Sequence, residues 1–358
     1  MKEITMKKKL VATILAMVCA VSLVGCGGTT ESGNATKGTE TAATDKSSGT
    51  ATEITISFGH DNNPGDPVEE AAEYWADRLE EVSGGTMKIN VYPSGQLGSK
   101  SDLLDQILAG DTVAAIGNGP FLADLGAPDL GILNAPYLFS SWEELDTLVA
   151  SDWYQEQMDI LEQKGIKVLA SNWRYGVRQT LTVKPVEHVS DLKGMKIRTQ
   201  STTVHVKGFE CLGATPTPMA LSDVYTALQQ KTIDGLENPL SVLYSGAYYE
   251  VAKNLTLDAH IRDLSCICVS ADVFNSLTEE QQQWLIETCE EAGEYQNELA
   301  AKADEECLQK MKDNGVTVYE VDEDEFKQAA ESFYEDPEIQ SMWSEGLVDK
   351  VKGIIGEE

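Results

Sequence analysis

The fold is decided by the stretch Asp191–Leu240, which reads DLKGMKIRTQSTTVHVKGFECLGATPTPMALSDVYTALQQKTIDGLENPL. Within it, Met195–Arg198 alternates apolar and polar residues, the period of a half-buried strand. A helix, a crossing that contains prolines, a second helix and the turn DGLENP are expected to follow. Arg198 falls where the strand ends, the usual position of a ligand-facing residue in an open α/β sheet. The stretch therefore predicts an α/β fold with a ligand site at this strand end.

Strands and helices alternate on the N-terminal side of this stretch. Ile54–Phe58 has the period of a strand. Asp66 is expected to cap a helix that has Pro67 at its first position, with Glu69 completing a capping box. Val113–Ile116 is a short apolar run typical of a parallel sheet. Repeated β-α-β units predict a mixed, mostly parallel sheet covered by helices.

One long helix is predicted near the C-terminus, starting at Thr278 and ending at Gly315. Its buried stripe recurs at spacings of three and four, with only Gln296 polar. A helix of about 37 residues is roughly 55 Å long, which exceeds the ~30 Å of a small domain. It is therefore expected to run along two domains. A coiled coil is the alternative, but the heptads are few and mixed.

The chain is strongly acidic, with a formal net charge of −32 over 358 residues. A surface of this charge argues against nucleic acid and against anionic lipid as partners. It does not exclude an anionic ligand, because exposed charges beyond about 8–10 Å are largely screened at physiological salt. Two arginines inside a cleft can outweigh a distant acidic surface.

The N-terminus has the features of a secretion signal. Lys7–Lys9 forms a positive region, Leu10–Val24 is apolar, and Leu23–Cys26 is similar to the lipobox of bacterial lipoproteins. A transmembrane anchor is the alternative, but the apolar run is shorter than the ~20 residues needed to span a bilayer. Gly27–Thr52 is rich in small polar residues and is expected to be a flexible tether. We therefore expect a signal peptide at 1–25, lipid on Cys26 followed by a linker at 26–52, and an extracytoplasmic, lipid-anchored protein.

Five cysteines lie beyond the tether in an odd set without paired spacing. Free, buried thiols are favoured over disulfides, which remain the alternative. These cysteines are Cys211, Cys266, Cys268, Cys289 and Cys307.

Four motifs of the opening stretch, DLKGMKIR, LGATPTPM, SDVYTALQ and DG-x-ENP, occur in order. With them, the chain from about Ile54 to Val348 resembles the solute-binding subunit of tripartite ATP-independent periplasmic (TRAP) transporters, DctP type. The resemblance implies a periplasmic-binding-protein-like fold whose chain crosses between domains near Ser171–Tyr175, near Arg262–Ser265 and within the long helix. The implied domains are 53–175 plus 264–303, and 176–263 plus 304–358.

The resemblance also implies a function. The chain would capture a small carboxylate without a cofactor and deliver it to the small and large membrane subunits of a TRAP permease. It would act as a monomer and not as an enzyme. The binding protein of an ATP-driven transporter, a receptor's ligand sensor and a secreted enzyme are the alternatives.

Two arginines are the principal candidates for binding a carboxylate. Arg198 matches the carboxylate-binding arginine of the family's K-x-R motif, and Arg178 matches the second arginine of its G-x-R-Q motif. A guanidinium meets a carboxylate with two parallel hydrogen bonds and does not deprotonate. A solvated surface charge is the alternative for either residue.

Polar residues at other strand ends complete the predicted site. Asn238 matches the family's asparagine beside the ligand, although an Asn before Pro is also an ordinary turn residue. Asn118, His60 and Asp61 follow strand ends and align with positions that line the family's cleft. Capping of their own loops is the alternative for these three.

The remaining candidates are apolar or aromatic. Trp173 and Tyr175 are expected either to stack on a ligand or to pack at the hinge, and the sequence leaves both open. Arg174 between them is expected to be solvated. Leu221 aligns with an apolar wall of the family's pocket.

Catalysis and metal binding find little support. Cys266 and Cys268 share a strand face, but no second pair stands at zinc spacing. No HExxH, GxSxG or phosphate-binding loop occurs. The histidines His188, His205 and His260 are expected on the surface or in packing.

The ligand class depends on Asp61. A carboxylate in the cleft would repel a second carboxylate of the ligand, whereas it accepts hydrogen bonds from sugar hydroxyls. Both asparagines suit hydroxyls as well. A uronate or related sugar acid is therefore favoured over a C4-dicarboxylate.

Overall fold

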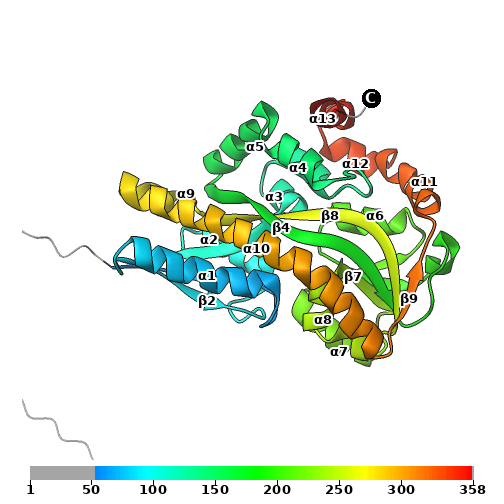
Figure 1. Ribbon diagram of the computed structural model, residues 1–358. Helices are drawn as coiled ribbons and strands as arrows, with labels where there is room; N and C mark the ends of the chain where they lie inside the picture. The colour runs from blue at the N-terminus through cyan, green and yellow to red at the C-terminus, as the bar shows by residue number, and fades with distance from the viewer. Residues whose placement is uncertain (1–52, 357–358) are drawn as a thin grey trace, which may run out of the picture. The chain divides into compact units, whose positions relative to one another are not determined.

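The computed structural model describes residues 53–356, so the predicted signal peptide, Cys26 and the tether lie outside the described residues (Figure 1). Residues Ala51–Glu358 form one compact unit. Within the described part of the chain, no helix is both long enough and apolar enough to cross a membrane.

The strands are β1 (Ile54–Gly59), β2 (Met87–Tyr92), β3 (Val113–Asn118), β4 (Ile166–Thr182), β5 (Lys196–Thr199), β6 (Thr215–Pro218), β7 (Gly235–Pro239), β8 (Asn254–Ser270) and β9 (Thr317–Glu320). The α-helices are α1 (Pro67–Val82), α2 (Lys100–Leu108), α3 (Gly119–Asp124), α4 (Trp142–Val149), α5 (Asp152–Gln163), α6 (Thr203–Glu210), α7 (Val224–Gln229), α8 (Leu240–Ser245), α9 (Ala271–Ser276), α10 (Glu279–Asp313), α11 (Glu323–Tyr334), α12 (Pro337–Met342) and α13 (Leu347–Ile355).

The described strands form one sheet in the order β2-β1-β3-β8-β4-β7-β5-β6, with β9 paired to β8. The pairs β1–β2, β1–β3, β5–β6, β5–β7 and β8–β9 are parallel. The pairs that involve β4 with β7 and β8, and β3 with β8, are antiparallel. The predicted mixed, mostly parallel α/β fold is confirmed.

Two long strands, β4 and β8, lie side by side in the middle of the sheet (Figure 1). Each has 17 residues. Their register shifts at several points, including between Ala170 and Trp173 and between Arg174 and Gly176. Such bulges bend a strand and increase its twist. The predicted crossings near Ser171–Tyr175 and Arg262–Ser265 lie in these two strands.

Helix α10 confirms the predicted long helix, with 35 residues from Glu279 to Asp313. Thr278 caps it in a capping box with Gln281. The helix packs against β4 and α1 (Figure 1). Close approach requires a glycine, because a Cβ at Gly293 would lie 2.2 Å from Asn172 Oδ1.

The start of α1 differs in one detail from the expectation. Asp66 caps the helix, and its Oδ1 accepts a hydrogen bond from the Val68 amide at 3.0 Å. Glu69, however, does not close a capping box, because its carboxylate lies 2.8 Å from His60 Nε2. The spacing of Asp66 and Glu69 therefore predicted the helix start correctly and the partner of Glu69 incorrectly.

The C-terminal helices contact both predicted domains. Helix α13 packs on α4, and α12 packs on α6. Phe333, Trp343 and Val351 share a buried cluster with Leu145 of α4 and Val204 of α6. The domain boundary within 304–358 therefore stays a prediction.

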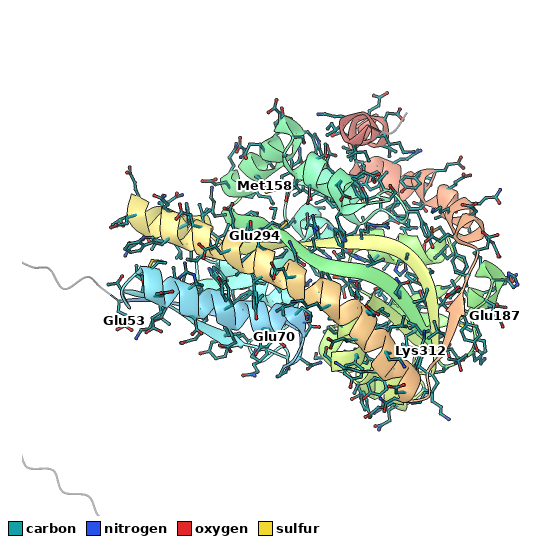
Figure 2. The ribbon with its side chains drawn as sticks, viewed as in Figure 1. Glu53, Glu70, Met158, Glu187, Glu294 and Lys312 are labelled. Atoms are coloured by element: carbon teal, nitrogen blue, oxygen red, sulfur yellow. The ribbon has the colours of Figure 1, made fainter. Side chains whose placement is uncertain are left out.

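The acidic composition is displayed on the outside of the molecule. Glu70, Glu187 and Glu294 are exposed and point outward (Figure 2).

The five cysteines beyond the tether are free, and all except the half-buried Cys211 are buried. This agrees with the expectation of free thiols.

Candidate functional site

A cavity opens where the carboxyl ends of β1 and β5 meet the start of α2 and the middle of β4. It encloses about 770 Å³, part of which is open to solvent. Ligands of open α/β sheets bind beyond the carboxyl ends of the strands. The lining residues are Gly59, His60, Asp61, Asn62, Ser99, Lys100, Ser101, Leu103, Ile116, Phe121, Tyr175, Arg178, Arg198, Gln200, Ser201, Met219, Ala220, Leu221 and Asn238.

Arg198 is a buried cation that forms no ion pair with the carboxylates of residues 53–356. Its side chain is 4% exposed, and its Nε and Nη2 donate to the Met219 carbonyl at 3.0 and 2.8 Å. Arg78, Arg174 and Arg178 form ion pairs, whereas Arg198 and the half-buried Arg262 donate to backbone carbonyls. Burial lowers the pKa of Arg198. Because a guanidinium has five N–H groups, three of them remain for a ligand.

Arg178, by contrast, is already neutralised. It is 1% exposed, and its Nε and Nη2 form a bidentate pair with the Glu237 carboxylate. Its Nη1 donates to Asp263 Oδ2 at 2.7 Å, and Nη2 also donates to the Glu237 carbonyl at 3.1 Å. Burial opposes the charge, but Glu237 and Asp263 raise the pKa of Arg178 above its usual value. One N–H of Arg178 remains without a partner among the described residues.

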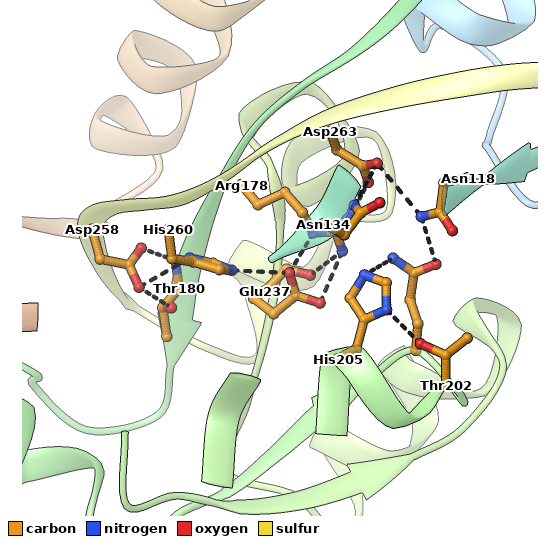
Figure 3. A network of polar contacts seen from close by, with 11 residues as sticks. Asn118, Asn134, Arg178, Thr180, Thr202, His205, Glu237, Asp258, His260 and Asp263 are labelled. Atoms are coloured by element: carbon orange, nitrogen blue, oxygen red, sulfur yellow. Dashed lines mark hydrogen bonds and ion pairs between the residues drawn. The ribbon is translucent and has the colours of Figure 1, made fainter. Parts of the chain in front are cut away.

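A chain of buried charges continues from Arg178 away from the cavity (Figure 3). His260 Nε2 lies 3.2 Å from Glu237 Oε2, and its Nδ1 lies 3.1 Å from Asp258 Oδ2. Thr180 donates to Asp258 through its hydroxyl at 2.6 Å and its amide at 3.0 Å. Burial alone would lower the pKa of His260, but Asp258 and Glu237 outweigh it and raise the pKa to about 9. His260 is therefore a cation that fixes Glu237, and Glu237 fixes Arg178.

A second branch of the same network runs through Asp263 (Figure 3). Asp263 Oδ1 accepts from Asn134 Nδ2 at 2.9 Å and from Asn118 Nδ2 at 3.5 Å. Asn118 also donates to Gln200 Oε1 at 3.4 Å. Gln200 Nε2 donates to His205 Nε2 at 3.0 Å, and burial lowers the pKa of His205 to about 3, so this ring is neutral. Asn118 therefore lies behind the cavity wall and supports Gln200, which lines it.

The loop after β1 supplies polar groups to the opposite side of the cavity. Asp61 is half-buried, and burial raises the pKa of its carboxyl despite the nearby Lys100 and Arg198. Asn62 Nδ2 donates to the Tyr175 hydroxyl at 3.1 Å. This bond holds the Tyr175 ring at the cavity wall.

The two aromatic candidates occupy different places. Tyr175 lines the cavity, whereas Trp173 does not. Trp173 is 1% exposed, and its Nε1 donates to the Cys289 carbonyl of α10 at 3.1 Å. Its position matches the packing alternative that the sequence left open. Arg174 is half-exposed and pairs with Asp146 at 2.6 Å.

The model of bacterial extracellular solute-binding protein family 7, or DctP, matches residues 58–341. The chain belongs to this family. The predicted membership is therefore confirmed. Family 7 proteins serve solute transport, and family 7 is not a family of enzymes. The chain is thus a TRAP periplasmic solute-binding protein, a class that binds small anions and works with membrane permease subunits.

Solved family members share the fold over most of this chain. A TRAP periplasmic solute-binding protein from Ochrobacterium anthropi with bound L-fuconate is 39% identical, with a TM-score of 0.82 over 85% of this chain and 100% of its own. One from Actinobacillus succinogenes 130Z with bound L-galactonate is 38% identical, with a TM-score of 0.81 over 85% and 99%. The 2,3-diketo-L-gulonate-binding periplasmic protein YiaO of Escherichia coli K12 is 32% identical over 74% of this chain and 80% of its own.

Most residues predicted as family 7 site residues come together in the cavity. Those that line it are Arg198, Arg178, Asn238, Asp61, His60, Tyr175 and Leu221. Asn118 and Trp173 lie outside the lining. Sequence reasoning missed Lys100, Gln200 and Phe121 as lining residues, Glu237 as a partner of Arg178, and His260 as a partner of Glu237. Glu237 stands beside Asn238 in the ENP motif, and Ser99 marks the start of the helix that carries Lys100, so both had a signal in the sequence.

Proposed function

We propose that this protein captures a hydroxylated monocarboxylate, a uronate or related sugar acid, and delivers it to a TRAP permease. The observation that carries the proposal is the charge of Arg198, which is buried at the cavity without a carboxylate partner. Leaving such a charge unpaired is costly, and a ligand carboxylate supplies the missing partner.

The two arginines have unequal parts in the proposed clamp. Arg198 contributes the charge and three free N–H groups. Arg178 contributes its single remaining N–H, because Glu237 and Asp263 already balance its charge. The clamp therefore matches one carboxylate in charge and holds it from two sides.

The rest of the cavity suits hydroxyl groups. Asp61 is an acceptor, Asn238 offers both a donor and an acceptor, and the Tyr175 ring can cover a C–H face. A second carboxylate of the ligand would approach Asp61. Burial already disfavours the negative charge of this residue. The sugar acids bound by the relatives, L-fuconate and L-galactonate, are hydroxylated monocarboxylates and support the same class.

The proposed ligand site lies between the two predicted domains, and these are expected to close on the ligand by bending in β4, β8 and α10. Hinge closure of this kind makes a protein more compact. Small-angle scattering should give a smaller radius of gyration at saturating ligand, and identical curves would contradict closure.

The predicted lipid on Cys26 would keep the protein beside its permease. We expect the full-length protein in the membrane fraction and a Cys26→Ala variant either released or left unprocessed. Wild-type protein found free in the medium would contradict the anchor.

A thermal-shift screen tests the ligand class. L-galactonate, L-fuconate and galacturonate are compared with succinate and malate at equal concentrations. A ligand at a hundredfold excess over its Kd stabilises by about 2.7 kcal/mol, which a thermal shift detects readily. Stabilisation by succinate or malate and none by the sugar acids would replace the proposal with the C4-dicarboxylate alternative.

A further inference from the structure

Lys100 is a cavity-lining cation that neither arginine network uses. It is the first residue of α2 and half-buried. Its Nζ lies 5.2 Å from the centre of the Phe121 ring and 6.0 Å from that of Tyr175. The lysine ion pairs among residues 53–356 involve other side chains, namely Lys88, Lys167, Lys207, Lys310 and Lys327.

The position of Lys100 is unfavourable for stability in two ways. The first turn of a helix carries a partial positive charge, so a cation there is repelled. Burial also lowers the pKa of Lys100, because the surrounding protein replaces water around the ammonium. Two aromatic faces compensate only in part. A ligand group that accepts hydrogen bonds would give the ammonium the partner that residues 53–356 do not supply.

Asp61 is a second charged residue of the cavity lining. Among charged groups, Asp61 acts most strongly on Lys100, and Lys100 acts most strongly on Asp61. Both line the cavity, yet they form no ion pair within 4.0 Å, unlike Lys88 and Glu53 at 2.8 Å. A donor and an acceptor therefore line the same cavity more than 4.0 Å apart.

We propose that Lys100 determines specificity by donating to a hydroxyl oxygen of the ligand while Asp61 accepts from a neighbouring hydroxyl. This inference rests on the proposed function, since the hydroxyls belong to the sugar acid held at Arg198. A hydroxyl donates and accepts at once, so two neighbouring hydroxyls satisfy a cation and an anion together. A second carboxylate satisfies only Lys100 and is repelled by Asp61. The pair therefore selects a polyhydroxylated chain over a second acid group.

Calorimetry of Lys100→Met with L-galactonate tests the proposal. Because a hydrogen bond to a charged group is lost, we expect binding about 10- to 100-fold weaker than wild type. Lys88→Met is the matched control, since it removes an equal charge from an exposed pair with Glu53. The control should bind within about twofold of wild type. Lys100→Arg, which keeps a donor, should recover part of the loss. The comparison is repeated in 1 M NaCl, where the screening length falls to about 3 Å and long-range attraction of the ligand by exposed charges is largely removed.

Three results separate the possible failures. Equal affinity of Lys100→Met and wild type for L-galactonate would overturn the role of Lys100 and leave the proposed function standing. Wild-type protein that binds galactarate, which has a second carboxylate in place of the terminal hydroxymethyl group, more tightly than L-galactonate would overturn the selection of hydroxyls. Wild-type protein that binds succinate and no sugar acid would overturn the proposed function and this inference together.

Discussion

The two cavity arginines are expected to differ in what they do for the free protein. In Arg178→Met, the carboxylates of Glu237 and Asp263 stay buried, with side chains 1% and 2% exposed; Asp263 loses its cation, and Glu237 keeps only His260. Removing one partner of a buried ion pair costs about 3–5 kcal/mol. In Arg198→Met, no carboxylate is left behind, and the loss of a bond to the Met219 carbonyl is offset by removal of an unpaired buried charge. We expect that variant within about 1 kcal/mol of wild type.

Urea unfolding of the ligand-free proteins at pH 7.5 measures this difference, with the slope m checked for constancy. In thermal unfolding, Arg178→Met should lower Tm by roughly 6–20 °C, since each kcal/mol corresponds to about 2–4 °C in proteins of moderate size. Arg174→Met is the control, because its ion pair with Asp146 is 33% and 54% exposed and is worth less than about 1 kcal/mol. Adding Asp263→Asn to Arg178→Met should restore part of the stability by removing the carboxylate that is left without a cation. Equal destabilisation by Arg178→Met and Arg198→Met would refute the proposal that the two arginines have unequal parts in the carboxylate clamp.

Two further changes test the framework around the site. Because the pKa of His260 is raised to about 9 from the usual value near 6.5, its contribution to the free energy of unfolding is complete below about pH 6.5 and is lost as pH rises through about 9. His260→Asn should flatten this part of the stability profile, and an unchanged decline would count against a charged His260. Gly293→Ala should destabilise by about 1–3 kcal/mol, because its Cβ would lie 2.2 Å from Asn172 Oδ1 and 2.7 Å from Trp173 Cδ1. Gly353→Ala, at a helical glycine with open space around its Cβ, is the control, and equal effects at both positions would refute close packing of α10 on β4.

The sequence predicted the features that depend on local pattern or on a motif. The period of Met195–Arg198, the cap at Asp66 and the long stripe of α10 each give a direct signal for an element. Arg198 was predicted at the ligand site because it falls at a strand end, and Asn238 because it matches the family's motif; both line the cavity.

What the sequence did not predict depends on partners far apart in the chain. Arg178 and Glu237 are 59 residues apart, and pairing of β4 with β7 brings them together. No local pattern distinguishes Arg178, whose charge is balanced, from Arg198, whose charge is free. Trp173 and Tyr175 are two residues apart on one strand, but the bulge between Arg174 and Gly176 and the packing of α10 place only Tyr175 at the cavity.

The most direct test of ligand capture is a calorimetric titration of wild type, Arg198→Lys and Arg198→Ala with L-galactonate. Losing one partner of a desolvated charge pair costs about 2–5 kcal/mol, so Arg198→Ala should bind roughly 30- to 4,000-fold more weakly with its circular dichroism unchanged. Arg198→Lys, which keeps the charge without the planar fork, should fall between the two. Wild-type affinity in Arg198→Ala would contradict an anchor at this residue.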